Sequence, residues 1–527
     1  QKKIHAMFST SIKSGLIRSF LCISFLIQTS CILQAQVLQK GRVEIGVRTS
    51  FESFSVVSLD SSGIALYRNF SGPTENQLEL IRLDTALNQV YRGFLPVPKG
   101  FTVSSAKVVA GKLYFLLENK TATDRIFQVF AVQVKDGSYL SYPIRNIIAF
   151  NATEFIASKK ALLIGGYFNF RPVVLFYSLK DHRSRILPGF LNEPGELTQI
   201  IASDEGDINV IVSGKNNSKR KCLWIRHFDE VGDLTKTVVL ESAEKKDLIF
   251  GRAAKADNGI QVIAGVYGRN STYSRGIFVA EVNTFGEYVI RYYNFADLHN
   301  FFHYMKAKRE KRIKERIERR KIRGKKTKFN YRFLVHELIP YGDQFLLVGE
   351  AFYPTYSSAY GSYNPRLFGN SPWSYPSTRY SNNPYLNRYS NPNQSDLVFT
   401  GFQYTHAIVI GFDAHAKLTW DNSFEINGLK SFYMEQFVKI LTDKEKIELF
   451  YLFQNNIRSK VINNSQIMEG TGQDPILVSD RQKKSSVESS KLEHWYGNHL
   501  FVYGIQAVKN GKNDVQRSFF INKLIAP

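Results

Sequence analysis

The sequence predicts an all-β fold, a β-propeller of eight four-stranded blades, on three observations. Short apolar runs return at a nearly constant interval, and alternating strands that end at Asp or Asn follow most of them. A strand near the start of the chain also matches one that is missing at its end. The chain has 527 residues, of which 43% are hydrophobic and 22% charged, so it can bury a large core.

The centres of the apolar runs set the period of the repeat. From centre to centre the gaps are 49, 49, 47, 52, 84, 103 and 52 residues. Most gaps lie near fifty, which is typical of a propeller blade and about half of what tandem β-sandwich domains need. The centres are Leu66, Phe115, Ile164, Ile211, Ile263, Leu347, Phe450 and Val502.

Turn residues and a spare strand complete the predicted ring. Asp and Asn side chains bond their own backbone at hairpin turns, which favours four strands per unit. Residues 42–47 alternate with period two and can supply the outer strand that the last unit lacks, which removes an exposed sheet edge. Seven blades is the alternative, because residues 455–495 are poorly patterned. The turn residues are Asp84, Asp136, Asp181, Asp229, Asn283 and Asp413.

The first long gap marks a basic insertion at residues 296–330. Between Lys306 and Lys328, fourteen Lys or Arg stand against three Glu, a net of +11 out of the formal +23. This concentration predicts an electrostatic site for an anionic partner, and a solvated helix without a partner is the alternative. The predicted binding residues are Lys308, Arg309, Lys311, Arg312, Lys314, Arg316, Arg319, Arg320, Lys321 and Arg323.

This insertion is predicted to be helical, because residues 300–339 contain no Pro and many good helix formers. Its apolar stripe is thin, so the helix is expected to project from the ring. The stripe consists of Phe302, Met305, Ile313, Ile317 and Ile322.

The second long gap marks an insertion at residues 353–399, rich in Tyr, Ser, Asn and Pro, between the second and third strands of unit six. Low aliphatic content predicts a long loop without regular structure. Tyr and Trp among small polar residues are typical of adaptable binding surfaces, and a disordered linker is the alternative. The predicted contact residues are Tyr356, Tyr360, Tyr363, Trp373, Tyr375 and Tyr380.

The two insertions are expected to share one face of the ring. Because antiparallel strands reverse direction, the link between two blades and the loop between strands two and three leave a blade at the same end. Both insertions belong to unit six, so we expect them to meet there. Large loops on a rigid scaffold are where binding usually lies.

Residues 1–36 have the pattern of a signal peptide, with Lys13 and Arg18 leading into an apolar run at residues 20–27. Residues 37–527 are then one exported propeller domain, in the periplasm or at the cell surface. A lipid-anchored form at Cys31 is an alternative, and so is a buried N-terminal helix. Cleavage near residue 36 leaves Cys222 as the single thiol, predicted to be a small core residue.

The sequence shows no phosphate-binding glycine loop, nucleophile elbow or paired-cysteine metal spacing. His299 and His303 are four residues apart, as the histidines of zinc sites often are, but no Glu stands beside His299. Two histidines that are hydrogen-bonded within the protein or that face solvent are therefore favoured over a metal site. No catalytic residue, metal or cofactor is therefore predicted. An enzyme remains an alternative, because propeller active sites are assembled from several blades.

By its repeat and closure the chain resembles bacterial secreted β-propellers, which implies a fold and not a function. The main hypothesis is an exported, noncatalytic propeller that binds an anionic envelope component or an envelope protein complex through its decorated face. Contact with a membrane surface fits this hypothesis, whereas export argues against genomic nucleic acid. The alternatives are a hydrolase or lyase acting on polysaccharide at the central channel, and a structural scaffold of a secretion or adhesion assembly.

Overall fold

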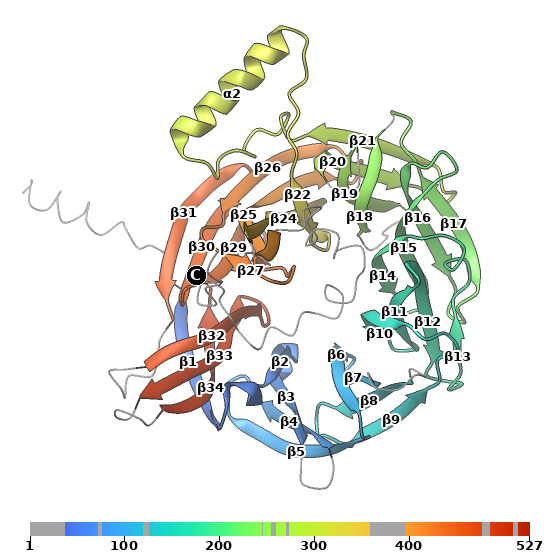
Figure 1. Cartoon of the computed structure of the whole chain (residues 1–527), viewed down its shortest axis with the longest axis vertical. Coiled ribbons are helices and arrows are strands. Elements are labelled where there is room, and N and C mark those ends of the chain that lie inside the picture. Colours follow the sequence, from blue (N-terminus) through green and yellow to red (C-terminus); the bar gives the residue numbers. More distant parts are fainter. Residues whose placement is uncertain are drawn as a thin grey trace, which may run out of the picture.

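Over the described residues, the computed structural model places eight antiparallel sheets in a ring, with the α-helix α2 outside the perimeter (Figure 1). It describes residues 37–71, 76–119, 126–244, 246–254, 260–269, 273–358, 397–476, 485–509 and 515–526. The predicted eight-bladed propeller is confirmed, and the seven-bladed alternative is wrong because residues 455–495 contribute strands to two separate blades.

The first four blades each consist of four consecutive strands. Blade 1 contains β2 (Ser55–Ser58), β3 (Ile64–Ser71), β4 (Asn76–Leu83) and β5 (Gln89–Val97). Blade 2 contains β6 (Phe101–Val109), β7 (Lys112–Asn119), β8 (Phe127–Gln133) and β9 (Tyr139–Ile144). Blade 3 contains β10 (Asn151–Ala157), β11 (Ala161–Phe168), β12 (Arg171–Ser178) and β13 (Ser184–Ile186). Blade 4 contains β14 (Glu196–Ala202), β15 (Ile208–Lys215), β16 (Lys221–Phe228) and β17 (Leu234–Leu240).

The other blades carry the insertions and the closure. Blade 5 contains β18 (Asp247–Ala253), β19 (Gln261–Gly268), β20 (Ser274–Val282) and β21 (Tyr288–Asn294). Blade 6 contains β22 (Arg332–Val335), β24 (Gln344–Ser358), β25 (Leu397–Asp413) and β26 (Leu418–Glu425), with short strands β23 (Ile339–Tyr341) and β27 (Lys430–Ser431) beside them. Blade 7 contains β28 (Lys439–Thr442), β29 (Ile447–Phe453), β30 (Asn456–Asn463) and β31 (Gln466–Pro475). Short 3-10 turns at Ser50–Glu52 and Asp60–Ser62 flank β2.

Blade 8 is built from both ends of the described chain, as the sequence predicted. β32 (Ser485–His494), β33 (His499–Lys509) and β34 (Val515–Ile525) are completed by β1 (Leu38–Val47), which pairs with β34 in an antiparallel register from Leu38↔Ile525 to Val47↔Arg517. Arg42 of β1 donates hydrogen bonds to Asn522 and Gln506 and lies over the Phe520 ring. The two ends of the ring are therefore held together by a full outer strand.

A β-bulge recurs in the innermost strand of several blades. The pairing register shifts by one residue within β6, β10, β14, β18 and β32. In three of these strands a hydroxyl at the bulge donates to a carbonyl of the next strand, namely Ser104 to Leu116, Thr153 to Gly165 and Thr198 to Ile211. Bulges bend and twist a strand, which suits an inner strand that must turn around the axis.

The predicted Asp and Asn turns are present between the third and fourth strands of the blades. The Asp84 carboxylate accepts backbone N–H groups of Ala86 and Asn88, and Asp229, Asn283 and Asp413 make the same pair of bonds. The recurrence of Asp at these turns is therefore explained by its hydrogen bonds to the turn backbone.

The core lies between neighbouring blades. One cluster joins Tyr114 and Phe127 of blade 2 to Phe155 and Ile164 of blade 3, and similar clusters join the other blades. Across the closure, Trp495 packs with Phe501 and Ile64, and its indole N–H donates to the carbonyls of Asp60 and Gly63. Each blade thus buries its faces against the next one, which is why the repeat needs a closed ring.

Candidate functional site

The helix α2 (Ala307–Ile322) is shorter than the predicted helical segment. Residues 300–306 form turns instead, because Phe301, Phe302 and Tyr304 are buried or half-buried in an aromatic cluster at the base of the insertion. The helix ends at Ile322, and two residues later Gly324 has a φ of 66° in the left-handed region. The N–H groups of Gly324 and Lys325 bond to carbonyls of the last turn. The predicted helical insertion at residues 296–330 is therefore helical only over residues 307–322.

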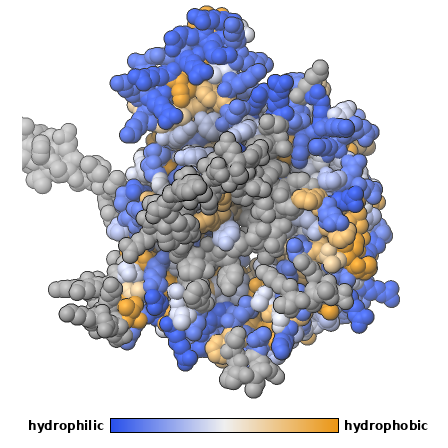
Figure 2. All heavy atoms as spheres, viewed as in Figure 1, coloured by the Kyte–Doolittle hydropathy of each residue, from blue (hydrophilic) through white to orange (hydrophobic). Residues whose placement is uncertain are grey.

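One side of α2 is turned toward the ring. Ile313 and Ile317 pack against the core cluster of blades 5 and 6, and Glu310 pairs with Lys314 at 2.7 Å and with His303 at 3.0 Å. Ile322 does not belong to this apolar stripe, since it is 83% exposed. Figure 1 shows the helix beyond the outer strands β26 and β31, and Figure 2 shows a mainly hydrophilic surface over it (top of the view). One face of the helix therefore packs against the ring, and the opposite face is exposed to solvent.

The exposed side of α2 carries a row of arginines that we call the arginine stripe. Its members are spaced by three, four, three and four residues, the spacing that places side chains on one helix face. All five are exposed, and none forms an ion pair with a residue that the structure describes. Their donors are therefore available to an external anion, apart from Arg319 Nε, which donates to the Glu315 carbonyl at 3.3 Å. The stripe consists of Arg309, Arg312, Arg316, Arg319 and Arg323.

The remaining predicted basic residues are not equivalent. Lys308, Lys311 and Lys321 are exposed, whereas Lys314 is engaged by Glu310 and Arg320 bonds to the Lys326 carbonyl. The structure therefore divides the predicted residues into free cations and cations that brace the helix. The three-four spacing is visible in the sequence, whereas the side of the helix that packs on the ring is not.

A buried histidine anchors the base of the insertion. The His406 ring on β25 stacks on Tyr304 with centroids 3.7 Å apart and makes T-shaped contacts with Phe301, Tyr331 and Phe333. Its Nδ1 lies 2.9 Å from the Thr405 hydroxyl, whereas its buried Nε2 has no hydrogen-bond partner among the described residues. Burial lowers the pKa of His406 to about 3, so the imidazole is neutral in the folded protein at physiological pH.

We expect His406 to make the protein less stable in mild acid. The unfolded chain binds a proton at an ordinary pKa of about 6.5, whereas the folded chain does not until about pH 3, so stability falls as pH drops below about 6.5. Between pH 7 and pH 5 the loss should be about 2 kcal/mol. Urea denaturation across this range, compared with His406→Phe, measures it: the variant should lose this component of the slope. Parallel curves for the two proteins would contradict the assignment.

The two histidines considered as metal ligands lie in the turns before the helix. The backbone N–H of His299 donates to Asp421 at 2.8 Å, and His303 contacts Glu310. Burial lowers the pKa of His303. Across the described ranges no cluster of three His, Cys, Asp or Glu is suited to a metal ion.

Cys222 is buried as predicted, and burial raises the pKa of its thiol to about 11.

The Tyr-rich insertion begins and ends as strand. β24 continues to Ser358 and β25 starts at Leu397, so the expectation of irregular structure from residue 353 to 399 is wrong at both ends. Tyr353 is half-exposed, and the Tyr356 ring packs on Phe399 at 5.9 Å. The physical reason is that aromatic and β-branched residues here pair across the hairpin. Five predicted contact residues lie outside the described residues: Tyr360, Tyr363, Trp373, Tyr375 and Tyr380. Residues 1–36, including Cys31, also lie outside them.

Both insertions leave blade 6 at the same end. Arg332, at the start of β22, pairs with Phe352, and the β24–β25 hairpin continues past this pair to Ser358↔Leu397. From that end, the first insertion runs outward to the perimeter, where Figure 1 shows α2. A contact between the helix and the middle of the Tyr-rich segment falls outside the described residues.

Charged side chains on the inner strands link consecutive blades. Arg252 of β18 forms an ion pair with Glu337, which follows β22, and Gln199 of β14 donates to the same carboxylate at 2.6 Å. Gln199 also exchanges hydrogen bonds with the backbone of Ala253. Glu337 is 58% exposed at its side chain, although its partner Arg252 is buried. These contacts join blades 4, 5 and 6, and no local sequence signal connects residues so far apart.

A second set of contacts joins blades 6, 7 and 8. The Glu350 carboxylate is buried, lies 2.7 Å from His336 Nε2, and accepts the N–H groups of Phe437 and Val438. Lys439 of β28 pairs with Glu493 of β32 at 2.6 Å. Each carboxylate is engaged by a cation or by backbone donors, so these groups act as clamps between blades.

The chain is similar to several solved structures at low sequence identity. No protein-family model and no curated protein matches the sequence. Similar solved structures include the β-propeller domain of the Trilobed protease from Pyrococcus furiosus, at 7% identity and a TM-score of 0.35, covering 79% of this chain and 98% of that one. Polysaccharide lyase Uly1 is similar at 10% identity and a TM-score of 0.40, covering 93% and 99%. The WD40 domain of Toxoplasma gondii coronin is similar at 9% identity and 0.34, covering 93% and 88%.

Proposed function

We propose that this propeller is an exported, noncatalytic binding protein that holds an anionic polymer of the cell envelope on the arginine stripe of α2. The observation that carries the proposal is the stripe itself: five guanidinium groups on one exposed helix face, without ion-pair partners among the described residues. Guanidinium groups bind carboxylate, phosphate and sulfate in a bidentate manner, which a row of lysines would not do as well.

The way α2 sits on the ring favours a polymer over a bilayer as the partner. A helix that lies in a membrane interface buries its apolar face among the lipids. In α2 that face, with Ile313 and Ile317, is already packed against blades 5 and 6. No helix in the described part of the chain is long and apolar enough to span a membrane. The signal-peptide pattern of residues 1–36 supports an envelope location for the partner.

Replacing the stripe with Gln should weaken binding to a soluble polyanion such as dextran sulfate by at least about tenfold at 0.15 M salt. The salt dependence of the affinity should also become shallower, because fewer charges engage the polymer. Deleting residues 300–328 would be a poor test, because it removes Phe301, Phe302 and Tyr304 from the core. The substitutions change only exposed side chains, and affinity can be measured by fluorescence anisotropy.

A matched control removes the same number of positive charges elsewhere. Equal weakening by the control and the stripe variant would show that net charge alone attracts the polymer, and would contradict the proposed site. The control residues, all exposed lysines, are Lys40, Lys99, Lys135, Lys180 and Lys215.

A further inference from the structure

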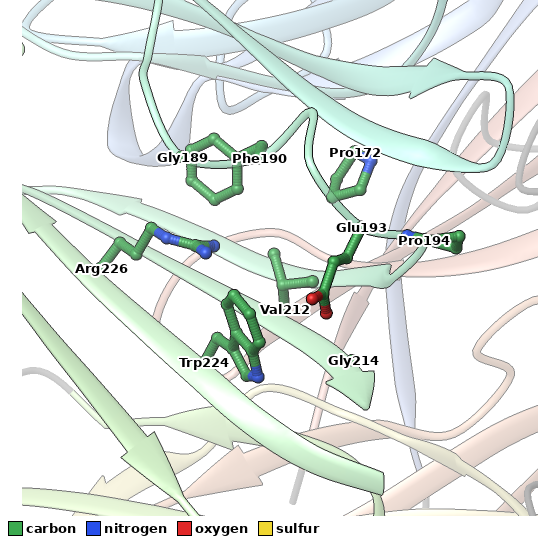
Figure 3. A pocket seen from close by; sticks show the side chains of 9 residues that line it. All are labelled: Pro172, Gly189, Phe190, Glu193, Pro194, Val212, Gly214, Trp224 and Arg226. Atoms are coloured by element: carbon green, nitrogen blue, oxygen red, sulfur yellow. The ribbon is translucent and has the colours of Figure 1, made fainter. Parts of the chain in front are cut away.

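A small pocket between blades 3 and 4 contains a buried arginine with an unusual environment (Figure 3). Arg226 of β16 is 5% exposed, and its guanidinium lies 4.7 Å from the ring centroids of both Phe190 and Trp224. Phe190 belongs to the link between β13 and β14, whereas Trp224 is on the same strand as Arg226. The two aromatic rings therefore hold the cation in place and leave the edges of its plane to other partners.

Gly189 provides the room for this arrangement. Its φ of 93° lies in the left-handed region, and a Cβ at this position would come within 3.0 Å of Arg226 Nε. A side chain at residue 189 would therefore be strained by its backbone and would push against the guanidinium. Neither the turn nor the position of the arginine is suggested by the sequence around it.

The guanidinium has no hydrogen-bond acceptor among the residues that the structure describes. Within the described residues, Arg226 donates no side-chain hydrogen bond and forms no ion pair, although Glu193 acts on it electrostatically. Burial lowers the pKa of Arg226 to about 10, so the group stays positively charged at neutral pH. A charged side chain that is only 5% exposed keeps little contact with water, and here it gains only the two rings in return, which is costly.

The space in front of Arg226 suits a small ligand. The pocket is open to solvent, its empty space of about 250 Å³ includes part of that solvent, and its apolar walls include Pro172, Pro194 and Val212. In Figure 3 the guanidinium of Arg226 and the carboxylate of Glu193 point into the same space from different sides. Glu193 is exposed, so it lies where the pocket meets solvent.

We propose that this pocket binds a small zwitterionic carboxylate of the α-amino-acid type. The ligand carboxylate would accept two hydrogen bonds from Arg226, and its ammonium group would face Glu193. The apolar walls would contact a short aliphatic side chain. A guanidinium presents a planar fork of donors that matches a carboxylate, which is why the proposal places that group on Arg226. The site is independent of the arginine stripe, since it lies on other blades and rests on other residues.

Isothermal titration calorimetry with three probes tests the proposal: L-alanine, propionate, which lacks the ammonium, and n-propylamine, which lacks the carboxylate. We expect L-alanine to bind with a Kd on the order of 1 mM, propionate several-fold more weakly, and the amine not at all. Glu193→Gln should reduce the affinity for L-alanine to that for propionate. Equal affinities for L-alanine and propionate in the native protein would overturn the role of Glu193.

Two variants separate loss of the site from loss of the fold. Arg226→Leu should abolish binding of both carboxylates. Gly214→Ala should weaken it at least tenfold, because the new methyl group would enter the pocket at 3.7 Å from Trp224 Nε1, an ordinary contact distance. Urea denaturation shows that each variant is folded. Absence of heat with L-alanine and propionate up to 50 mM, or unchanged binding in folded Arg226→Leu, would overturn the proposal and leave Arg226 hydrated by water alone.

Discussion

Removing β1 is expected to destabilise the whole ring, with a loss of more than about 5 kcal/mol in the free energy of unfolding. A chain that starts at Arg48 loses the strand that pairs with β34 over its length, together with the bonds from Arg42 to Asn522 and Gln506. It also uncovers part of the cluster around Phe519 and Trp495. The measurement is urea denaturation, with a chain that starts at Val37 as the reference.

The open edge left on β34 gives this prediction a second readout. Unpaired strand edges recruit other chains, so the shortened protein should self-associate, which light scattering detects. A synthetic peptide of residues 37–48, added in trans, should restore both the monomeric state and most of the stability. A shortened chain that stays monomeric and unfolds at the same urea concentration would show that β1 is an accessory strand.

Glu350→Ala is expected to be the most damaging single substitution considered, with a loss of about 3–5 kcal/mol. The Glu350 side chain is fully buried on β24, and its carboxylate satisfies His336 and the N–H groups of Phe437 and Val438. Its removal leaves three donors without this acceptor at the junction between blades 6 and 7, two of them buried and that of Phe437 partly buried. Urea denaturation measures the loss.

Two further substitutions make the Glu350 result specific. Glu350→Gln keeps the shape and one acceptor oxygen, so its cost should be clearly smaller. Asp204→Ala removes a carboxylate from an exposed pair with Lys159 and should cost less than about 1 kcal/mol. Similar losses for the buried and the exposed carboxylate would contradict the role assigned to Glu350 as a clamp.

Much of the fold could be predicted from the sequence because each blade is a local unit. A run such as Leu113–Leu117 is apolar throughout because its two faces are covered by the blades on either side, blade 1 and blade 3. Turn residues such as Asp84 and Asp229 bond to their own backbone within four residues, so their role is also visible locally. The closure was predictable from the spare strand at residues 42–47.

The helix prediction failed where packing outweighed propensity. Residues 300–306 lack helix breakers, yet Phe301, Phe302 and Tyr304 gain more by surrounding His406 than by extending α2. In the Tyr-rich insertion the strands extend further than expected, because Tyr356 and Phe399 pair across the hairpin. The composition of both segments correctly identified them as insertions into the repeat, but it did not show where the helix and the strands within them begin and end.

The sequence by itself determined the eight-fold repeat, the order of the blades, the closing strand and the charge of the inserted helix. These properties follow from contacts between residues close along the chain, from the spacing of the apolar runs, or from the number of charged residues in a segment. The tertiary structure decided which carboxylates clamp neighbouring blades. It also decided which arginines of α2 are free of ion pairs with described residues, and that Arg226 lies between Phe190 and Trp224 with no acceptor among those residues. Each of these depends on how one element is placed against another, because burial and pairing are set by the packed ring and not by local spacing.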